Sequence, residues 1–150
     1  MSVKEERARE LFAKGYNCAQ AVLGAFCGED GLDKNTAFRL ANGFGGGMRC
    51  GEACGAVSGA VLAIGLKCGF CAEGDFEQKG FCNKKSYEFI EKFKEARGSV
   101  LCRELLGLDI RRPEDHNNPA VQEKHKSLCP EIIAAAVRIL ENMEFEREEN

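Results

Sequence analysis

The sequence predicts an all-α fold: one domain of 150 residues, a bundle of six or seven helices around a central Gly/Ala-rich helix. Apolar residues recur at the three- and four-residue spacing of amphipathic helices along most of the chain. There is no run of β-branched alternation and no hairpin dipeptide between apolar runs. Only three prolines interrupt the chain, and its length suits one domain.

Capping residues mark the starts of the first three helices. Ser2 with Glu5 and Asn17 with Gln20 have the spacing of capping boxes, and Asp33 is a good N-cap for the third helix. Each helix is expected to end at a nearby glycine: Gly15, Gly28 and Gly43. The second helix has the clearest apolar stripe, at Cys18, Ala21, Val22, Ala25 and Phe26.

The chain then enters a glycine-rich loop, residues 43–51, followed by an apolar helix that closes near Cys68. Gly51, Gly55 and Gly59 recur every four residues, which leaves one face of this central helix bare. Each interior glycine costs a helix about 1 kcal/mol relative to alanine. The sequence therefore predicts that another backbone packs closely against this face.

The second half of the chain continues as alternating short and long elements. Asp75 is expected to start a short capped turn, and a fifth helix covers Tyr87 to Ala96 and stops at Gly98. Ser99 caps a short helix over 100–106.

A polar segment, 109–127, is expected to be a surface loop with at most a short helix. The last helix starts with Cys129 as N-cap and Pro130 at its first position. Its predicted core face is Ile133, Ala136, Val137, Leu140 and Met143.

Composition excludes several classes of protein. The net charge is −3 and basic residues are scattered, which does not suit nucleic-acid binding or an anionic membrane. The charged N-terminus lacks the apolar core of a secretory signal. The longest uncharged apolar run, 53–66, is too short to span a bilayer. We expect a cytoplasmic protein that does not insert into membranes.

Nine cysteines are unusual for this length. Because the number is odd, complete internal disulfide pairing is impossible, and in a reducing compartment ligands or redox thiols are favoured over structural disulfides. Four share a place at the start of a predicted helix: Cys18, Cys54, Cys102 and Cys129. Helix N-termini lower thiol pKa values. These four suit a Cys₄ iron–sulfur cluster, soft metal ions or two dithiol pairs, whereas the simplest alternative is four small buried apolar side chains.

A family resemblance selects the same four cysteines. It is carried by Asn17-Cys18-Ala19-Gln20-Ala21-Val22, Gly43-Phe44-Gly45-Gly46-Gly47-Met48, Cys54-Gly55-Ala56-Val57-Ser58-Gly59, Cys102-Arg103-Glu104-Leu105-Leu106-Gly107 and Cys129-Pro130. The chain resembles the C_GCAxxG_C_C family of redox-active proteins over roughly residues 10–140. The resemblance implies that the four family cysteines are Cys18, Cys54, Cys102 and Cys129 and that their role is redox chemistry. Some relatives resemble part of split-Soret cytochromes.

The other five cysteines lie outside that pattern. Cys50, four residues before the CGAxxG cysteine, is a candidate accessory ligand or resolving thiol. Cys68 and Cys71 have redox-motif spacing, but they close a helix, where the dipole disfavours a thiolate. A second metal site with Cys82 would lack a fourth ligand, and Cys27 is expected in the core.

Two histidines and two arginines are weaker candidates. His116 and His125 lie in or beside the polar segment and are expected to be solvated, since neither has a metal-protease or c-type haem motif around it. Arg49 and Arg103 either supply positive charge beside the cysteines or are simply solvated.

We therefore expect a small cysteine-based redox protein, an electron carrier or an oxidoreductase, with an iron–sulfur cluster or dithiol/disulfide cycling at the four cysteines. The alternative is a thiolate site for zinc, copper or a heavy metal without redox turnover. A third possibility is a structural domain that docks onto a redox partner. A redox partner protein is expected, and the four thiols meet either within one chain or across a homodimer.

Overall fold

In the computed structural model, residues 1–148 are described. They form helices joined by short turns and no named β-strand. The α-helices are α1 Val3–Ala13, α2 Cys18–Phe26, α3 Lys34–Ala41, α4 Gly55–Cys68, α5 Phe76–Arg97, α6 Cys102–Leu106, α7 Pro119–Ser127 and α8 Cys129–Glu141. The predicted all-α bundle is confirmed, with more helices than the six or seven expected.

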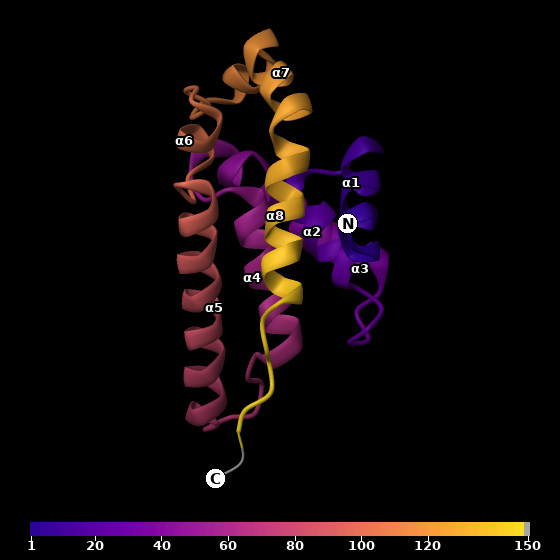
Figure 1. The fold of residues 1–150 in the computed structure, drawn as a ribbon, viewed down its shortest axis with the longest axis vertical. Coiled ribbons are helices and arrows are strands. Elements are labelled where there is room, and N and C mark those ends of the chain that lie inside the picture. The colour runs from indigo at the N-terminus through magenta and orange to yellow at the C-terminus, as the bar shows by residue number, and fades with distance from the viewer. Residues whose placement is uncertain (149–150) are drawn as a thin grey trace.

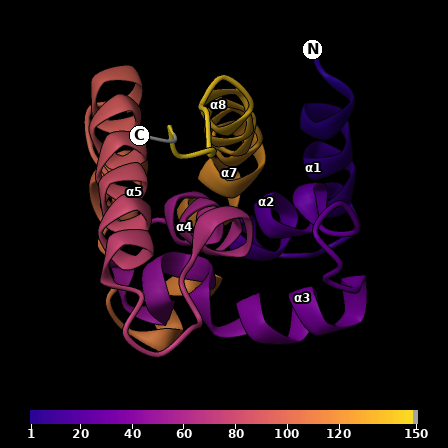
Figure 2. The same cartoon turned by 90° about the horizontal axis from the view of Figure 1, so that it is seen from below.

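Helix α4 occupies the middle of the bundle. It packs against α2, α5 and α8, and seen from below it lies between α5 and α2 with α8 above it (Figure 2). Its apolar residues are buried nearly all round. Figure 1 shows that α8 runs alongside α4 and α5, while α6 and α7 sit at the end where α4 and α8 begin. The functional residues gather at that end.

The bare face of α4 is the surface that meets α2. A Cβ atom built on Gly59 would lie 2.7 Å from the carbonyl oxygen of Ala19, and one on Gly55 would lie 3.0 Å from Cβ of Cys18. This confirms the prediction for these two glycines. Gly51 is different: it ends an irregular turn, Gly47–Gly51, before the helix starts, and its φ is +74°.

The predicted N-caps of the first three helices are all present. Asn17 and Gln20 form a complete capping box, and Asp33 accepts from the backbone N–H groups of Asn35 and Thr36. Ser2 accepts from the N–H of Glu5, but the Glu5 carboxylate does not close the box. It is buried and pairs with Arg138 of α8 at 3.0 Å, which ties the two ends of the chain together.

Four predictions for the second half of the chain are wrong. The N-cap of α6 is Leu101 and not Ser99, whose hydroxyl accepts from the N–H of Leu101 before the helix starts. Asp75 caps not a short turn but the 22-residue helix α5, whose buried face is Phe89 and Phe93. The N-cap of α8 is Leu128 rather than Cys129, which is the first helical residue.

The polar segment 109–127 also holds more helix than expected. Pro113–Asn117 forms a 3₁₀-helix and 119–127 forms α7, with Asn118 as N-cap and Pro119 in the first turn. The predicted core face of α8 is buried throughout, from Ile133 to Met143. None of the helices in the described part of the chain is both long enough and apolar enough to cross a bilayer.

Candidate functional site

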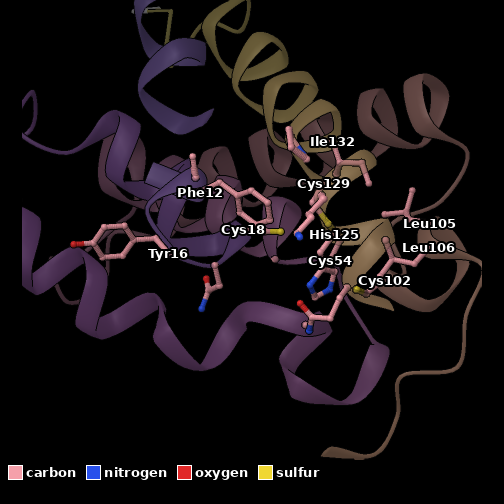
Figure 3. Close-up of a pocket in the computed structure, with 18 of the residues that line it drawn as sticks. Phe12, Tyr16, Cys18, Cys54, Cys102, Leu105, Leu106, His125, Cys129 and Ile132 are labelled. Atoms are coloured by element: carbon pink, nitrogen blue, oxygen red, sulfur yellow. The ribbon is translucent and has the colours of Figure 1, made fainter. Parts of the chain in front are cut away.

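A cavity of about 590 Å³ opens at the end of the bundle where α2, α4, α6 and α8 all begin. All four helix-start cysteines line it: Cys18, Cys54, Cys102 and Cys129. Figure 3 shows their labelled side chains gathered around one space, with His125 beside them. A single chain therefore brings the four cysteines together, and no second subunit is needed to assemble the group.

Cys54 and Cys102 are held next to each other by backbone pairing. Ala53 and Leu101 form an antiparallel β-bridge. The N–H of Cys54 donates to the carbonyl of Val100, and the N–H of Cys102 donates to the carbonyl of Glu52, both at 2.7 Å.

The bridge is supported from outside by Arg103. Its guanidinium donates to the Gly51 carbonyl at 3.0 Å and pairs with the Glu52 carboxylate at 2.8 Å. Arg103 thus stabilises the turn next to Cys102 and is not among the residues that line the cavity.

Cys18 and Cys129 reach the cavity from the other two helix starts. The capping box of α2 fixes the backbone at Cys18, and the missing side chain of Gly55 leaves room for its Cβ. Cys129 begins α8 directly after α7 ends, with Pro130 in the first turn. Each of the four cysteines thus lies at a helix N-terminus, as the sequence predicted.

The expected lowering of thiol pKa values is wrong for three of the four cysteines. Burial raises the pKa of Cys54 to about 11, although the backbone N–H groups of Ala56 and Val57 act in the opposite direction. Burial likewise raises the pKa of Cys102 to about 12, and the neighbouring thiols add to the effect. Loss of hydration outweighs the partial charge of a helix end when the sulfur is enclosed.

Cys129 is the exception. Its thiol interacts directly with that of Cys18, and this interaction lowers the pKa of Cys129 in spite of burial. The same interaction, followed by burial, raises the pKa of Cys18. The directions of the two shifts make Cys129 the first of the two thiols to lose its proton.

Positive charge surrounds the thiols. Arg9 of α1, Arg49 of the glycine turn and Lys126 of α7 line the cavity beside the titratable His125, and no aspartate or glutamate is among its lining residues. Sequence reasoning missed Arg9 and Lys126. The one available signal was spacing, because His125 and Lys126 lie one helical turn before Cys129.

The histidine predictions need correction. His116 is only 6% exposed, and neither ring nitrogen has a hydrogen-bond partner within the described residues. It packs against Gly46, where an added Cβ would lie 2.7 Å from the His116 ring. His125 is half-buried in the cavity wall, and burial, His116 and Arg49 together lower its pKa.

The remaining cysteines lie outside the cavity lining. Cys50 sits in the irregular turn and its thiol donates to the Gly47 carbonyl at 3.5 Å, while Cys27 is buried at the end of α2, as expected. Cys68 is buried at the C-terminal end of α4, and its pKa is raised to about 12 by burial and by the neighbouring thiol of Cys82. Cys71 is exposed.

The placement of the possible ligands has different consequences for a single metal ion and for a metal cluster. Among residues 1–148, no three histidine, cysteine, aspartate or glutamate side chains are placed to hold one metal ion. A [4Fe–4S] cluster makes a different demand, because each of its four cysteines binds a different iron atom. Four thiols with a basic surround also suit the negative charge of an iron–sulfur cluster.

Comparison with protein families gives one match. The protein-family model described as "Putative redox-active protein (C_GCAxxG_C_C)" matches residues 16–143, which include all four cavity cysteines. Comparisons with curated proteins and with solved structures gave no match.

Proposed function

The chain belongs to the C_GCAxxG_C_C family of redox-active proteins, and from this premise we propose that it works by thiol–disulfide exchange between Cys129 and Cys18. The observation that carries the proposal is that both thiols line one cavity, each from the start of a helix. Their interaction also shifts their pKa values in opposite directions and lowers that of Cys129. The thiolate is the attacking form of cysteine. Cys129 is thus the attacking thiol and Cys18 the resolving thiol.

The exchange has two steps. The Cys129 thiolate attacks one sulfur of a substrate disulfide, a mixed disulfide forms, and the other substrate sulfur leaves as a thiol after taking a proton from water. In the mixed disulfide, the interaction with the Cys129 thiol that raises the pKa of Cys18 is lost. Cys18 then loses its proton to water and attacks the Cys129 sulfur, and the second substrate sulfur leaves as a thiol after taking a proton from water. One substrate disulfide becomes two thiols while the protein dithiol loses two electrons. An external dithiol, such as that of a partner protein, returns the pair to its reduced state.

Cys54 and Cys102 have a different part in this scheme. Their pKa values, about 11 and about 12, keep both protonated near neutral pH. They do not compete with Cys129 as nucleophiles, although both line the same cavity.

A second candidate is an iron–sulfur cluster held by all four cysteines. It is favoured by the convergence of four thiols on one cavity whose lining contains cations and no carboxylate. When bound, such a cluster would supply one-electron transfer. The chain's own contribution would be to hold the thiolates and to offset their charge through Arg9, Arg49 and Lys126.

One preparation tests both candidates. The protein is purified without oxygen, its visible spectrum, iron and sulfide are measured, and its disulfides are mapped by mass spectrometry after titration with oxidised dithiothreitol. Exchange predicts an iron-free protein and one reversible disulfide, Cys18–Cys129. Stoichiometric iron and sulfide with no such disulfide would overturn the exchange proposal in favour of the cluster. Stoichiometric zinc and thiols that resist oxidation would favour metal binding instead.

A further inference from the structure

The charges on the cavity wall are unevenly distributed. Four cationic or titratable basic side chains line it, while the polar remainder is the neutral Asn17 and Gln122. On a chain with net charge −3, a wall without a carboxylate is a local excess of positive charge. Such a wall attracts anions into the cavity.

Most of this positive charge is not neutralised by the protein. In the described residues, no carboxylate lies within ion-pair distance of Arg49 or Lys126. Arg9 pairs with Glu131 at 3.2 Å through one terminal nitrogen, but its buried Nε has no partner among residues 1–148. The charge of Arg9 is thus partly offset, whereas those of Arg49 and Lys126 are not.

The position of Arg49 is held by an unusual turn. Gly46, Gly47, Met48 and Arg49 all have φ between 60° and 65°. Two of these are not glycines, and a left-handed conformation costs such residues free energy. The turn places Arg49 among the residues that line the cavity, together with the four cysteines.

The rest of the wall suits a small molecule with an aliphatic part. Phe12, Leu105, Leu106 and Ile132 supply apolar surface to the same cavity. A volume of about 590 Å³ lies in the ordinary range of small-ligand pockets.

Resting on the exchange function proposed above, we propose that the substrate is a low-molecular-weight disulfide that carries carboxylates. Arg49 and Lys126 attract the carboxylates, the apolar wall takes the aliphatic chain, and the disulfide lies against Cys129. The exchange is balanced as written in the preceding subsection, with the small disulfide reduced to two thiols.

Three symmetric disulfides of similar size test the charge preference: the dianion 3,3′-dithiodipropionate, the neutral bis(2-hydroxyethyl) disulfide and the dication cystamine. Formation of the Cys18–Cys129 disulfide in the reduced protein is followed by acid quench and mass spectrometry at pH 7 and low salt. Each rate constant is divided by that for the neutral thiol 2-mercaptoethanol, which removes the intrinsic reactivity of the reagent. We expect the dianion to be about 10-fold or more faster than the neutral disulfide, and the dication to be slowest.

Two variants and one control test which side chains cause the preference for the dianionic disulfide. Arg49→Gln and Lys126→Gln should each reduce the dianion-to-neutral ratio about 3-fold or more, and 0.5 M salt should reduce it in the parent protein. Lys124→Gln is the matched control, since Lys124 is exposed on the same helix and does not line the cavity. Equal normalised rates for all three reagents would overturn the charge preference alone. Failure of all three to form the Cys18–Cys129 disulfide would overturn the exchange function itself.

Discussion

Two pairs of neighbouring thiols lie near opposite ends of α4. The two pairs differ in their positions on the helices and in their access to a cavity. Cys18 and Cys129 line an open cavity at the end where α4 begins, together with Cys54. Cys68 and Cys82 interact near the end where α4 finishes, about 20 Å away along a 14-residue helix. We call these the cavity pair and the distal pair.

The comparison shows that a pair of thiols is not enough to make a reactive site. In the cavity pair, Cys129 starts α8, and its interaction with the Cys18 thiol lowers its pKa. In the distal pair, Cys68 is the last residue of α4, where the dipole disfavours a thiolate, and its thiol donates to the Ile64 carbonyl at 3.3 Å. Helix polarity and access to a cavity distinguish the two.

The largest expected effect comes from removing one thiol of each pair. Cys129→Ser should abolish intramolecular disulfide formation in the cavity, because serine neither attacks a disulfide nor forms one. Cys82→Ser is the matched control and should leave the rate within about 2-fold. Disulfide mapping during reaction with bis(2-hydroxyethyl) disulfide measures both. If Cys82→Ser abolished the reaction and Cys129→Ser did not, the assignment of the reactive pair would be reversed.

The rates of alkylation distinguish the cavity pair from the distal pair without any mutation. At pH 7 the thiolate fraction at Cys68, with a pKa of about 12, is roughly a hundred-thousandth, whereas that at Cys129, below its usual pKa of 9, exceeds a hundredth. Iodoacetamide should therefore modify Cys129 about 1,000-fold faster than Cys68. Peptide mapping over time gives both rates, and faster labelling of Cys68 would contradict the assigned pKa directions.

Substitutions at two glycines of α4 test, through the stability of the fold, how closely α2 packs on the bare face. Gly59→Ala places a Cβ 2.7 Å from the Ala19 carbonyl oxygen, a backbone atom that cannot move aside cheaply, and should destabilise the fold by about 2 kcal/mol. Gly65→Ala meets no atom within 4 Å and should stabilise it by about 1 kcal/mol through helix propensity. Urea unfolding measures both. Equal effects of the two variants would mean that α2 does not pack on the bare face as closely as described.

Local signals were sufficient for much of this fold. The caps at Ser2, Asn17 and Asp33 are made by side chains within three residues of the N–H groups they serve, so sequence spacing specifies them. The glycine spacing of α4 likewise predicted close packing. It could not name the partner, because the contact of Gly59 with Ala19 is made across 40 residues of chain.

The missed elements had weak local signals. Val121 is the one buried residue of α7, so no apolar stripe marked that helix in the sequence. The candidate site is harder still to predict from the sequence. The placing of Cys54 beside Cys102 depends on a bridge between distant residues, Ala53 and Leu101. The lowered pKa of Cys129 depends on its contact with Cys18 from another helix.

Both ends of α4 share one further effect, which tests burial of the thiols rather than their reactivity. The pKa values of Cys54 and Cys68 are raised to about 11 and about 12, while an unfolded cysteine loses its proton near pH 9. Between these values the unfolded state binds fewer protons, so each thiol's contribution is complete below pH 9 and is lost as pH rises through the folded pKa.

Between pH 9 and 11, each buried thiol should make the free energy of unfolding fall by up to about 1.4 kcal/mol per pH unit. Cys54→Ala and Cys68→Ala should each flatten this slope, whereas Cys71→Ala, at an exposed position, should not. Urea unfolding of the reduced proteins at a series of pH values gives the slopes, and lysine and tyrosine titration is common to all of them. Identical slopes for all three variants would show that the thiols at both ends are hydrated. The two ends of α4 would then differ in helix polarity alone and not in enclosure.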